Sequence, residues 1–196
     1  MPRIDKPSRP VPPRVAQAQK AARASEFAMS CTDRTGLVLR TLAASKPGGR
    51  VLELGTGTGV GTAWLLAGMD HNARLITIES DPVRCAVARG VIMTDSRAHL
   101  HCADAAEWLT TVVGEPFDLA FVDCRPGKFT HRAELFARLA PGALYVVDDL
   151  LPQPTWPDDH QDRVDQFLAE IQDESELLCT TMHWNSGMLL GVKASE

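Results

Sequence analysis

Residues 51–61 read Val51-Leu52-Glu53-Leu54-Gly55-Thr56-Gly57-Thr58-Gly59-Val60-Gly61, and this stretch decides the fold. A short apolar run comes first, a glycine-rich turn follows, and then an apolar helix starts that continues through Leu66. Glycine tolerates positive φ and lets a ligand approach the backbone closely. The first turn of the following helix offers free N–H groups. The stretch therefore predicts a strand, a turn and a helix that together form a ligand-binding corner.

The spacing of the glycines separates two classes of ligand. The dinucleotide fingerprint G-x-G-x-x-G fails in both registers, because Val60 or Thr62 stands in its last position. The stretch instead matches an acid followed by three glycines at alternate positions: Glu53, Gly55, Gly57 and Gly59. This pattern resembles motif I of the class I S-adenosylmethionine-dependent methyltransferases. The resemblance implies that the turn, with Thr56, lies against the methionine part of the cofactor. A tight turn in any α/β protein is the alternative.

Composition describes a globular chain without an obvious polyanion-binding surface. The chain has 196 residues, enough for one domain with a complete central sheet. Hydrophobic residues make up 44% and the net charge is −5, which argues against a nucleic-acid partner. No apolar run is long enough for a membrane span, and the N-terminus lacks the apolar core of a secretory signal. We expect a cytoplasmic protein with no membrane partner.

The cysteines support the same expectation. The chain has five of them, at positions 31, 85, 102, 124 and 179. None forms a CxxC pair or a zinc-type spacing, and an odd number cannot all pair. The sequence therefore predicts reduced thiols, as is usual in the cytoplasm.

Strands and helices alternate along most of the chain. Residues 1–13 hold five prolines and predict a disordered tail, so the folded domain is expected over 14–196. The patterns predict strands at 50–54, 74–79, 99–102, 118–123 and 143–148, and helices at 14–27, 37–45, 60–69, 105–113, 130–139, 160–172 and from Pro82 onward. Segments 176–184 and 187–193 predict a closing hairpin. The expected fold is α/β: a single-domain, Rossmann-like methyltransferase fold with a mostly parallel seven-stranded sheet, helices on both faces and an antiparallel C-terminal hairpin.

Polar residues follow the predicted strands, where ligands bind in open α/β sheets. Glu79 ends the second strand, and its carboxylate has the geometry to accept hydrogen bonds from both ribose hydroxyls. A helix-dipole role beside Asp81 is the alternative. Asp104 has capping-box spacing with Glu107. The family resemblance also implies that an acid at this position lies near the adenine amino group.

The second half of the chain narrows the resemblance. The segments 117–123 and 145–149 resemble the catechol and caffeoyl-CoA type of O-methyltransferase, in which an Asp after strand four and an Asp-Asn pair after strand five hold a divalent metal. The resemblance places Mg²⁺ or Ca²⁺ on Asp123, Asp148 and Asp149, with Asp149 where the family usually has Asn. Three carboxylates without a cation would repel one another. The alternative is that Asp149 points to solvent and caps the next turn.

The general base departs from this family pattern. Catechol-type members carry a lysine three residues after the strand-four Asp, and Pro126 stands there in this chain. Lys128 lies two residues later and is the best candidate base, with Asp123 beside it. Arg125 is a poor base because guanidinium hardly ever loses its proton.

The segment 28–36 resembles the one that covers the cofactor in the same group. The full predicted cofactor set is Met29, Cys31, Glu53, Gly55, Thr56, Gly57, Gly59, Glu79, Ser80, Asp104, Ala105 and Asp123. The loop 150–160 carries Trp156 and is expected either to wall an acceptor pocket or only to connect elements. His131, His160 and His183 are interpreted as surface or structural residues.

Together these patterns predict an enzyme that moves a methyl group from S-adenosylmethionine to a hydroxyl of a small-molecule acceptor, assisted by a divalent metal. Three alternatives stay open: a metal-independent methyltransferase for another acceptor type, a cofactor-binding module without catalysis, and, more distantly, an NAD-dependent oxidoreductase. The N-terminal helix leaves a homodimer open.

Overall fold

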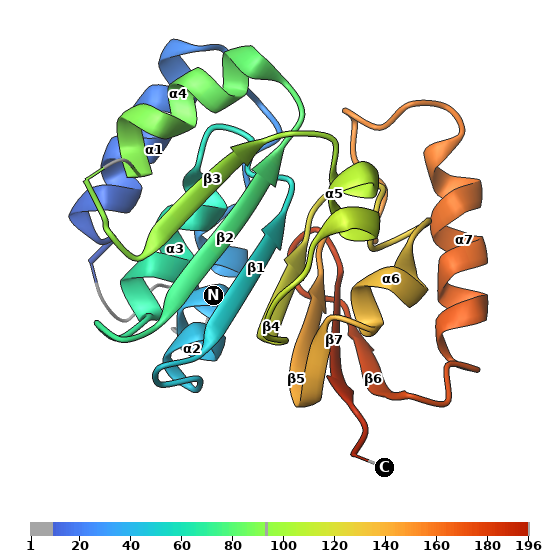
Figure 1. Cartoon of the computed structure of the whole chain (residues 1–196). Helices are drawn as coiled ribbons and strands as arrows, with labels where there is room; N and C mark the ends of the chain where they lie inside the picture. Colours follow the sequence, from blue (N-terminus) through green and yellow to red (C-terminus); the bar gives the residue numbers. More distant parts are fainter. Residues whose placement is uncertain (1–9, 93, 196) are drawn as a thin grey trace.

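The central sheet has seven strands in the order β3-β2-β1-β4-β5-β7-β6 (Figure 1). The computed structural model describes residues 10–92 and 94–195. Its strands are β1 Arg50–Leu54, β2 Arg74–Glu79, β3 Ala98–Cys102, β4 Phe117–Val122, β5 Leu139–Val147, β6 Leu177–Met182 and β7 Met188–Lys193. The first five pair in parallel, and β7 runs antiparallel to both β5 and β6. The predicted sheet and its antiparallel C-terminal hairpin are confirmed.

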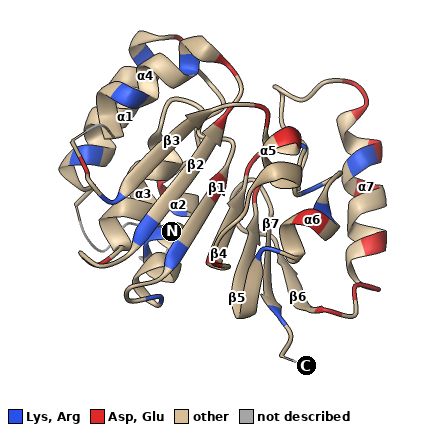
Figure 2. Cartoon of the chain, in the orientation of Figure 1, with Lys and Arg blue, Asp and Glu red and all other residues tan. Residues whose placement is uncertain are grey.

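Helices cover both faces of this sheet (Figure 1). They are α1 Pro13–Ala24, α2 Asp33–Ala44, α3 Val60–Gly68, α4 Pro82–Ile92, α5 Ala105–Thr111, α6 Arg132–Phe136 and α7 His160–Ile171. The first four share one buried cluster with the sheet, and the last three share the other. In α7 the residues at helical spacing, Val164, Phe167 and Ile171, are buried, while charged residues also run along this helix (Figure 2). Within the described residues, no helix is long and apolar enough to cross a membrane.

Several predicted boundaries differ from the structure, among them the start of α2, which begins at Asp33 and not at residue 37. Helix α1 stops at Ala24 because the chain turns through Glu26, whose φ is 56°. The helix predicted over 130–139 shrinks to α6, since His131 takes a φ of 55° before it and Leu139 after it already pairs with Phe117 as strand. Strand β5 is correspondingly longer than predicted. Most of the tail predicted over 1–13 lies outside the described residues, and α1 begins at Pro13.

The prediction of five reduced thiols is wrong for one pair, because Cys85 and Cys102 form a disulfide. Cys85 lies in the first turns of α4, and Cys102 ends β3. Helix α4 packs on β3, which brings the two Cα atoms within 6.0 Å although 17 residues separate them in sequence. Spacing alone carried no sign of this pairing. Cys31, Cys124 and Cys179 are free thiols.

The last turn of the chain is tied to the second helix. The Trp184 indole N–H donates to Arg34 O at 3.2 Å, and the Asn185 side-chain amide donates to Thr35 Oγ1 at 3.4 Å. These contacts join residues 150 positions apart. They bring the β6–β7 turn to the carboxyl ends of the parallel strands.

Candidate active site

The carboxyl ends of β1, β2, β4 and β5 border one cavity of about 520 Å³. It lies where the strand order reverses between β1 and β4, the position at which open α/β sheets bind ligands. The sequence-predicted residues that line it are Met29, Cys31, Glu53, Gly55, Thr56, Gly57, Glu79, Ser80, Asp104, Ala105, Asp123, Lys128, Asp148 and Asp149. Gly59 does not line it. Gly59 is the N-cap of α3, with a φ of 92°, and faces Ala88 of α4.

The glycine turn forms the floor of the cavity at β1. Gly55 and Gly57 both take positive φ, at 94° and 55°. A Cβ on Gly57 would lie 2.9 Å from the Phe27 ring, so the turn packs closely under the loop that follows α1. That loop, residues 27–32, lines the cavity from above. A side chain on Gly57 would clash with the Phe27 ring and one on Gly55 with the Asp123 backbone, so the turn requires glycine at both positions.

Glu53 lies under the turn rather than beside it. Its side chain is fully buried, and Oε2 accepts hydrogen bonds from the hydroxyls of Thr62 and Thr77. Among the described residues, Oε1 has no hydrogen-bond partner. Burial is the main cause that raises the pKa of Glu53 to about 7, against the two hydroxyl hydrogen bonds that lower it. Glu53 thus presents a carboxyl group with a spare oxygen at the base of the cavity.

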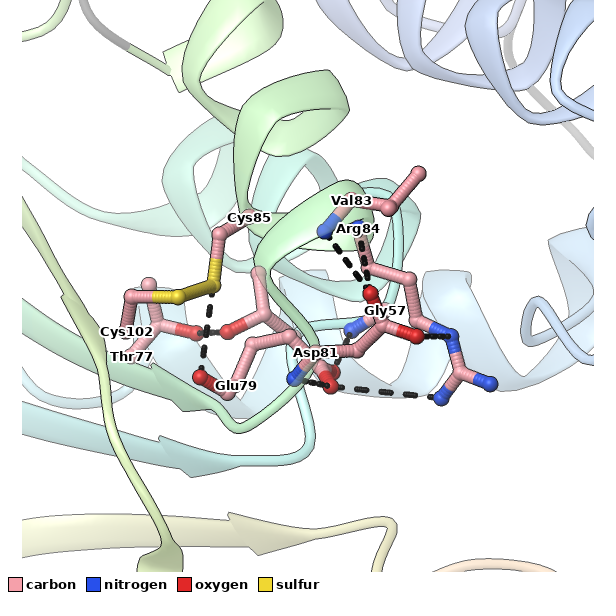
Figure 3. Close-up of a disulfide and its surroundings, with 9 residues drawn as sticks. Gly57, Thr77, Glu79, Asp81, Val83, Arg84, Cys85 and Cys102 are labelled. Atoms are coloured by element: carbon pink, nitrogen blue, oxygen red, sulfur yellow. Dashed lines mark hydrogen bonds and ion pairs between the residues drawn. A yellow bond between two sulfur atoms is a disulfide. The ribbon is translucent and has the colours of Figure 1, made fainter.

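Glu79 is held by the backbone on both sides (Figure 3). Its Oε2 accepts from Gly57 N at 2.8 Å and its Oε1 accepts from Asp81 N at 3.0 Å. The Arg84 guanidinium lies 3.9 Å from Oε1, and the Cys85–Cys102 disulfide lies next to the same strand end. A carboxylate has about four acceptor positions, so each oxygen keeps one for a ligand. The structure therefore fixes the orientation of Glu79 and leaves it able to accept two more hydrogen bonds.

Asp104 does what its capping-box spacing predicts. Its Oδ1 accepts from Ala106 N at 2.7 Å and from Glu107 N at 3.1 Å, at the start of α5. The same residue also lines the cavity. Asp104 can both cap α5 and contribute to the site, because the cap uses only Oδ1 and leaves Oδ2 free of the cap.

The three acids after β4 and β5 do not form the predicted metal site. In the part of the chain that the structure describes, no group of acidic, His or Cys side chains gathers in a way that could hold a metal ion. Asp148 Oδ1 accepts from Ser186 Oγ at 2.6 Å and from Asp149 N at 2.8 Å. Asp149, with a φ of 66°, turns its Oδ2 to the Trp156 indole N–H at 2.7 Å. These residues do not fit a divalent cation as arranged here.

Lys128 lies among these acids. Its side chain is only 2% exposed, and Nζ donates to Asp148 O at 3.0 Å. Burial raises the pKa values of Asp123 and Asp148, and the positive charge of Lys128 opposes that rise at both. The lysine that sequence position alone left in doubt is therefore brought into the site.

A compact loop delivers Lys128 to this position. Phe129 N donates to Arg125 O at 2.8 Å, and Gly127 takes a φ of 84°. The buried Tyr145 hydroxyl donates to Gly127 O at 2.6 Å. Because the chain turns back within residues 125–129, Lys128 reaches the cavity although it lies two residues after Pro126, where the family has its lysine.

Some lining residues were not predicted. His160 was interpreted as surface or structural, but it is 8% exposed and lines the cavity, and its ring is tilted by 38° against the Trp156 ring with 4.3 Å between the ring centroids. Burial lowers the pKa of His160, and the nearby charge of Lys128 lowers it further. Asn185 and Ser186 arrive from the β6–β7 turn. Only the Trp-containing loop had a signal in the sequence, as a possible acceptor wall.

Known proteins resemble this chain in sequence and in fold. A family model described as "Methyltransferase domain" matches residues 52–150, half of the chain. The chain belongs to this methyltransferase family. The matched range starts in β1 and ends just after β5, so it contains the glycine turn and all the acids that border the cavity.

Individual relatives and solved structures agree with this family assignment. It is 33% identical over 144 residues to the catechol O-methyltransferase of Niastella koreensis, a match that covers 70% of this chain and 65% of that protein. The cofactor-bound crystal structure of Rv0187 from MTB superimposes with a TM-score of 0.84 at 26% identity, covering 95% of this chain and 92% of that one. The O-methyltransferase TomG from Streptomyces achromogenes, solved with SAM, shares the fold with a TM-score of 0.82 at 23% identity and the same coverages. The chain thus spans just under two thirds of the curated relative's length.

Proposed function

We propose that this protein transfers a methyl group from S-adenosylmethionine to a hydroxyl of a small-molecule acceptor. One observation carries the proposal: a single cavity is lined by the glycine turn, Glu79, Asp123 and Lys128. The O-methyltransferase names of the relative from Niastella koreensis and of TomG support the same reaction.

The cofactor would lie along the first end of the cavity. Its methionine part lies against Gly55 and Gly57, its ribose hydroxyls donate to Glu79, and its adenine lies near Asp104. Loop 27–32, which lines the cavity, would cover it, and the Arg84 guanidinium lies 5.0 Å from the centre of the Phe27 ring in a cation–π contact that holds this loop. This placement gives a physical role to the glycine turn, Glu79, Asp104 and the loop 27–32.

The acceptor would lie at the other end, between Lys128 and the Trp156–His160 pair. In the transfer, the acceptor oxygen forms a bond to the methyl carbon while the bond from that carbon to sulfur breaks. The electron pair of the broken bond stays on sulfur, and the hydroxyl proton leaves. Holding donor and acceptor in line supplies much of the rate enhancement in such displacements. The protein's part is to align the two, and the hydroxyl proton passes to bulk water.

Calorimetric titration of S-adenosylmethionine, in parallel with NAD, tests the proposal. We expect the sulfonium cofactor to bind with a Kd on the order of micromolar and NAD not to bind. Glu79→Gln is expected to weaken cofactor binding at least about tenfold, because a charge-assisted pair to the ribose is lost.

The matched control is Glu107→Gln, which removes an exposed acid of α5 outside the cavity and should leave the Kd unchanged. Binding of NAD without S-adenosylmethionine, or an equal effect of both variants, would contradict the proposal.

A further inference from the structure

The acids expected to hold a divalent cation share the cavity with a buried lysine, Lys128. We propose that the Lys128 ammonium replaces the divalent cation, so that methyl transfer by this protein needs no metal. This inference rests on the proposed function, and it assigns the source of positive charge beside the acceptor oxygen.

Charge is the first argument. Asp123, Asp148 and Asp149 all line the cavity after β4 and β5, and carboxylates taken out of water need a compensating positive charge. Lys128 supplies one from within the chain, because its side chain is almost fully buried and its Nζ donates to Asp148 O at 3.0 Å. Electrostatic attraction is strong in a desolvated site, and a second cation beside the ammonium would be repelled.

The use of the oxygens is the second argument. A hard divalent cation takes several oxygen ligands at once, commonly one or two carboxylates with water. Asp149 Oδ2 is engaged by the Trp156 indole, and Asp148 Oδ1 accepts two hydrogen bonds from Ser186 and the backbone. Lys128 Nζ uses fewer carboxylate oxygens than a divalent cation would, since its one hydrogen bond within the described residues goes to the main-chain oxygen of Asp148.

The rigidity of the loop is the third argument. Tyr145 and Gly127 fix the loop by a buried hydrogen bond of 2.6 Å, and the Gly127 position packs against Leu54 and Leu135. An ammonium has three N–H donors, so two remain for an acceptor oxygen after the bond to Asp148 O. A fixed cation of this kind stabilises an acceptor oxygen that has given its proton to bulk water, and that oxygen then attacks the methyl carbon.

Thermal unfolding with and without Mg²⁺ tests this assignment without needing to know the acceptor. Wild-type protein should show no change in Tm on addition of about 10 mM MgCl₂, because ligands raise Tm only when they bind the folded state. Lys128→Ala removes the ammonium and leaves Asp123 and Asp148 uncompensated. We expect Mg²⁺ to raise the Tm of this variant by several degrees and to bind it in calorimetry. Lys128→Met keeps the length of the side chain without its charge and serves as the second variant.

Lys193→Ala is the matched control. Its Nζ also donates to main-chain carbonyls, of Phe136 and Leu139, but lies outside the cavity, so Mg²⁺ should not affect this variant. Stabilisation of the wild type by Mg²⁺, with loss on addition of chelator, would overturn the proposal. So would a lack of response in both Lys128 variants, because Lys128 would then not be filling a cation's place. Titration of S-adenosylmethionine into the same proteins separates this outcome from failure of the proposed function.

Discussion

Glu53 shows at the residue scale how the site uses a buried acid. Its carboxyl is fully buried beneath the glycine turn, with the Thr62 and Thr77 hydroxyls as its hydrogen-bond donors. Its pKa is raised from near 4.5 to about 7 in the folded protein. Between these two values the folded protein binds a proton that the unfolded chain does not bind. The free energy of unfolding must therefore fall as the pH rises through this window.

Substitution of Glu53 by Gln should remove this pH dependence. Relative to Glu53→Gln, the wild type is expected to lose about 3 kcal/mol of unfolding free energy between about pH 5 and about pH 8. Urea unfolding of both proteins without cofactor, at the two pH values, measures the difference. Glu107→Gln, at an exposed acid, should change by less than about 0.5 kcal/mol over the same range. Parallel pH profiles for the wild type and Glu53→Gln would mean that Glu53 is not protonated in the folded state.

At the scale of elements, the contact between α2 and α3 depends on a glycine. Gly36 lies under the Trp64 indole, and a Cβ at that position would overlap the ring. Trp64 is almost fully buried, so it has little room to move. Gly36→Ala should therefore lower the free energy of unfolding by about 1–3 kcal/mol through overpacking.

At Gly90 in α4, substitution by alanine is expected to have the opposite effect on the free energy of unfolding. Nothing lies within 4 Å of a Cβ added there. Gly90→Ala should stabilise the protein by roughly 0.5–1 kcal/mol, because alanine costs less than glycine in a helix. Chemical denaturation of both variants checks the pair, and two changes of the same sign would contradict it.

Elements with a local signal were predicted well from the sequence. The glycine turn, the Asp104 cap and the Asp81-Pro82 start of α4 each depend on neighbouring residues, and each is present in the structure. The boundaries that failed depend on tertiary pairing. Leu139 joins β5 because Phe117 lies beside it in space, which no local pattern reveals.

The residues of the site divide in the same way, into those that a local sequence pattern predicts and those that only tertiary packing brings in. Its cofactor end follows strand ends that a βαβ pattern places at one edge, so sequence reasoning found most of it. His160 and Ser186 enter from elements far along the chain, and only the packing of α7 and of the hairpin brings them in. Lys128 was found from a family pattern that it does not match in spacing. Its role as a cation depends on contacts that the sequence does not list.

At the scale of the whole molecule, the Cys85–Cys102 disulfide links α4 to β3 at the cofactor end of the sheet (Figure 3). A link across a loop of this length restricts the unfolded chain and is worth about 3 kcal/mol. The double substitution Cys85→Ser with Cys102→Ser should lower the free energy of unfolding by up to about that amount. Reducing agent should lower the Tm of the wild type to that of the double variant. It should leave the Tm of the double variant unchanged.

Cys179→Ser is the control, because Cys179 is a free thiol on β6. It should retain the response of the wild type to reducing agent. If reductant had the same effect on the double variant as on the wild type, the stabilisation would not come from this disulfide.

The hairpin turn at residues 184–186 has a consequence for the protein as it is made. Ser186 donates to Asp148 and Trp184 donates to Arg34 at the start of α2, so part of the cavity wall comes from a turn that follows all five parallel strands in the chain. A ribosome adds about 5–20 residues per second, and the parallel strands emerge first. A nascent chain halted before position 184 would thus carry the glycine turn but an unfinished acceptor end. The wall of the cavity is therefore complete only once this hairpin has been synthesised and β7 has paired with β5.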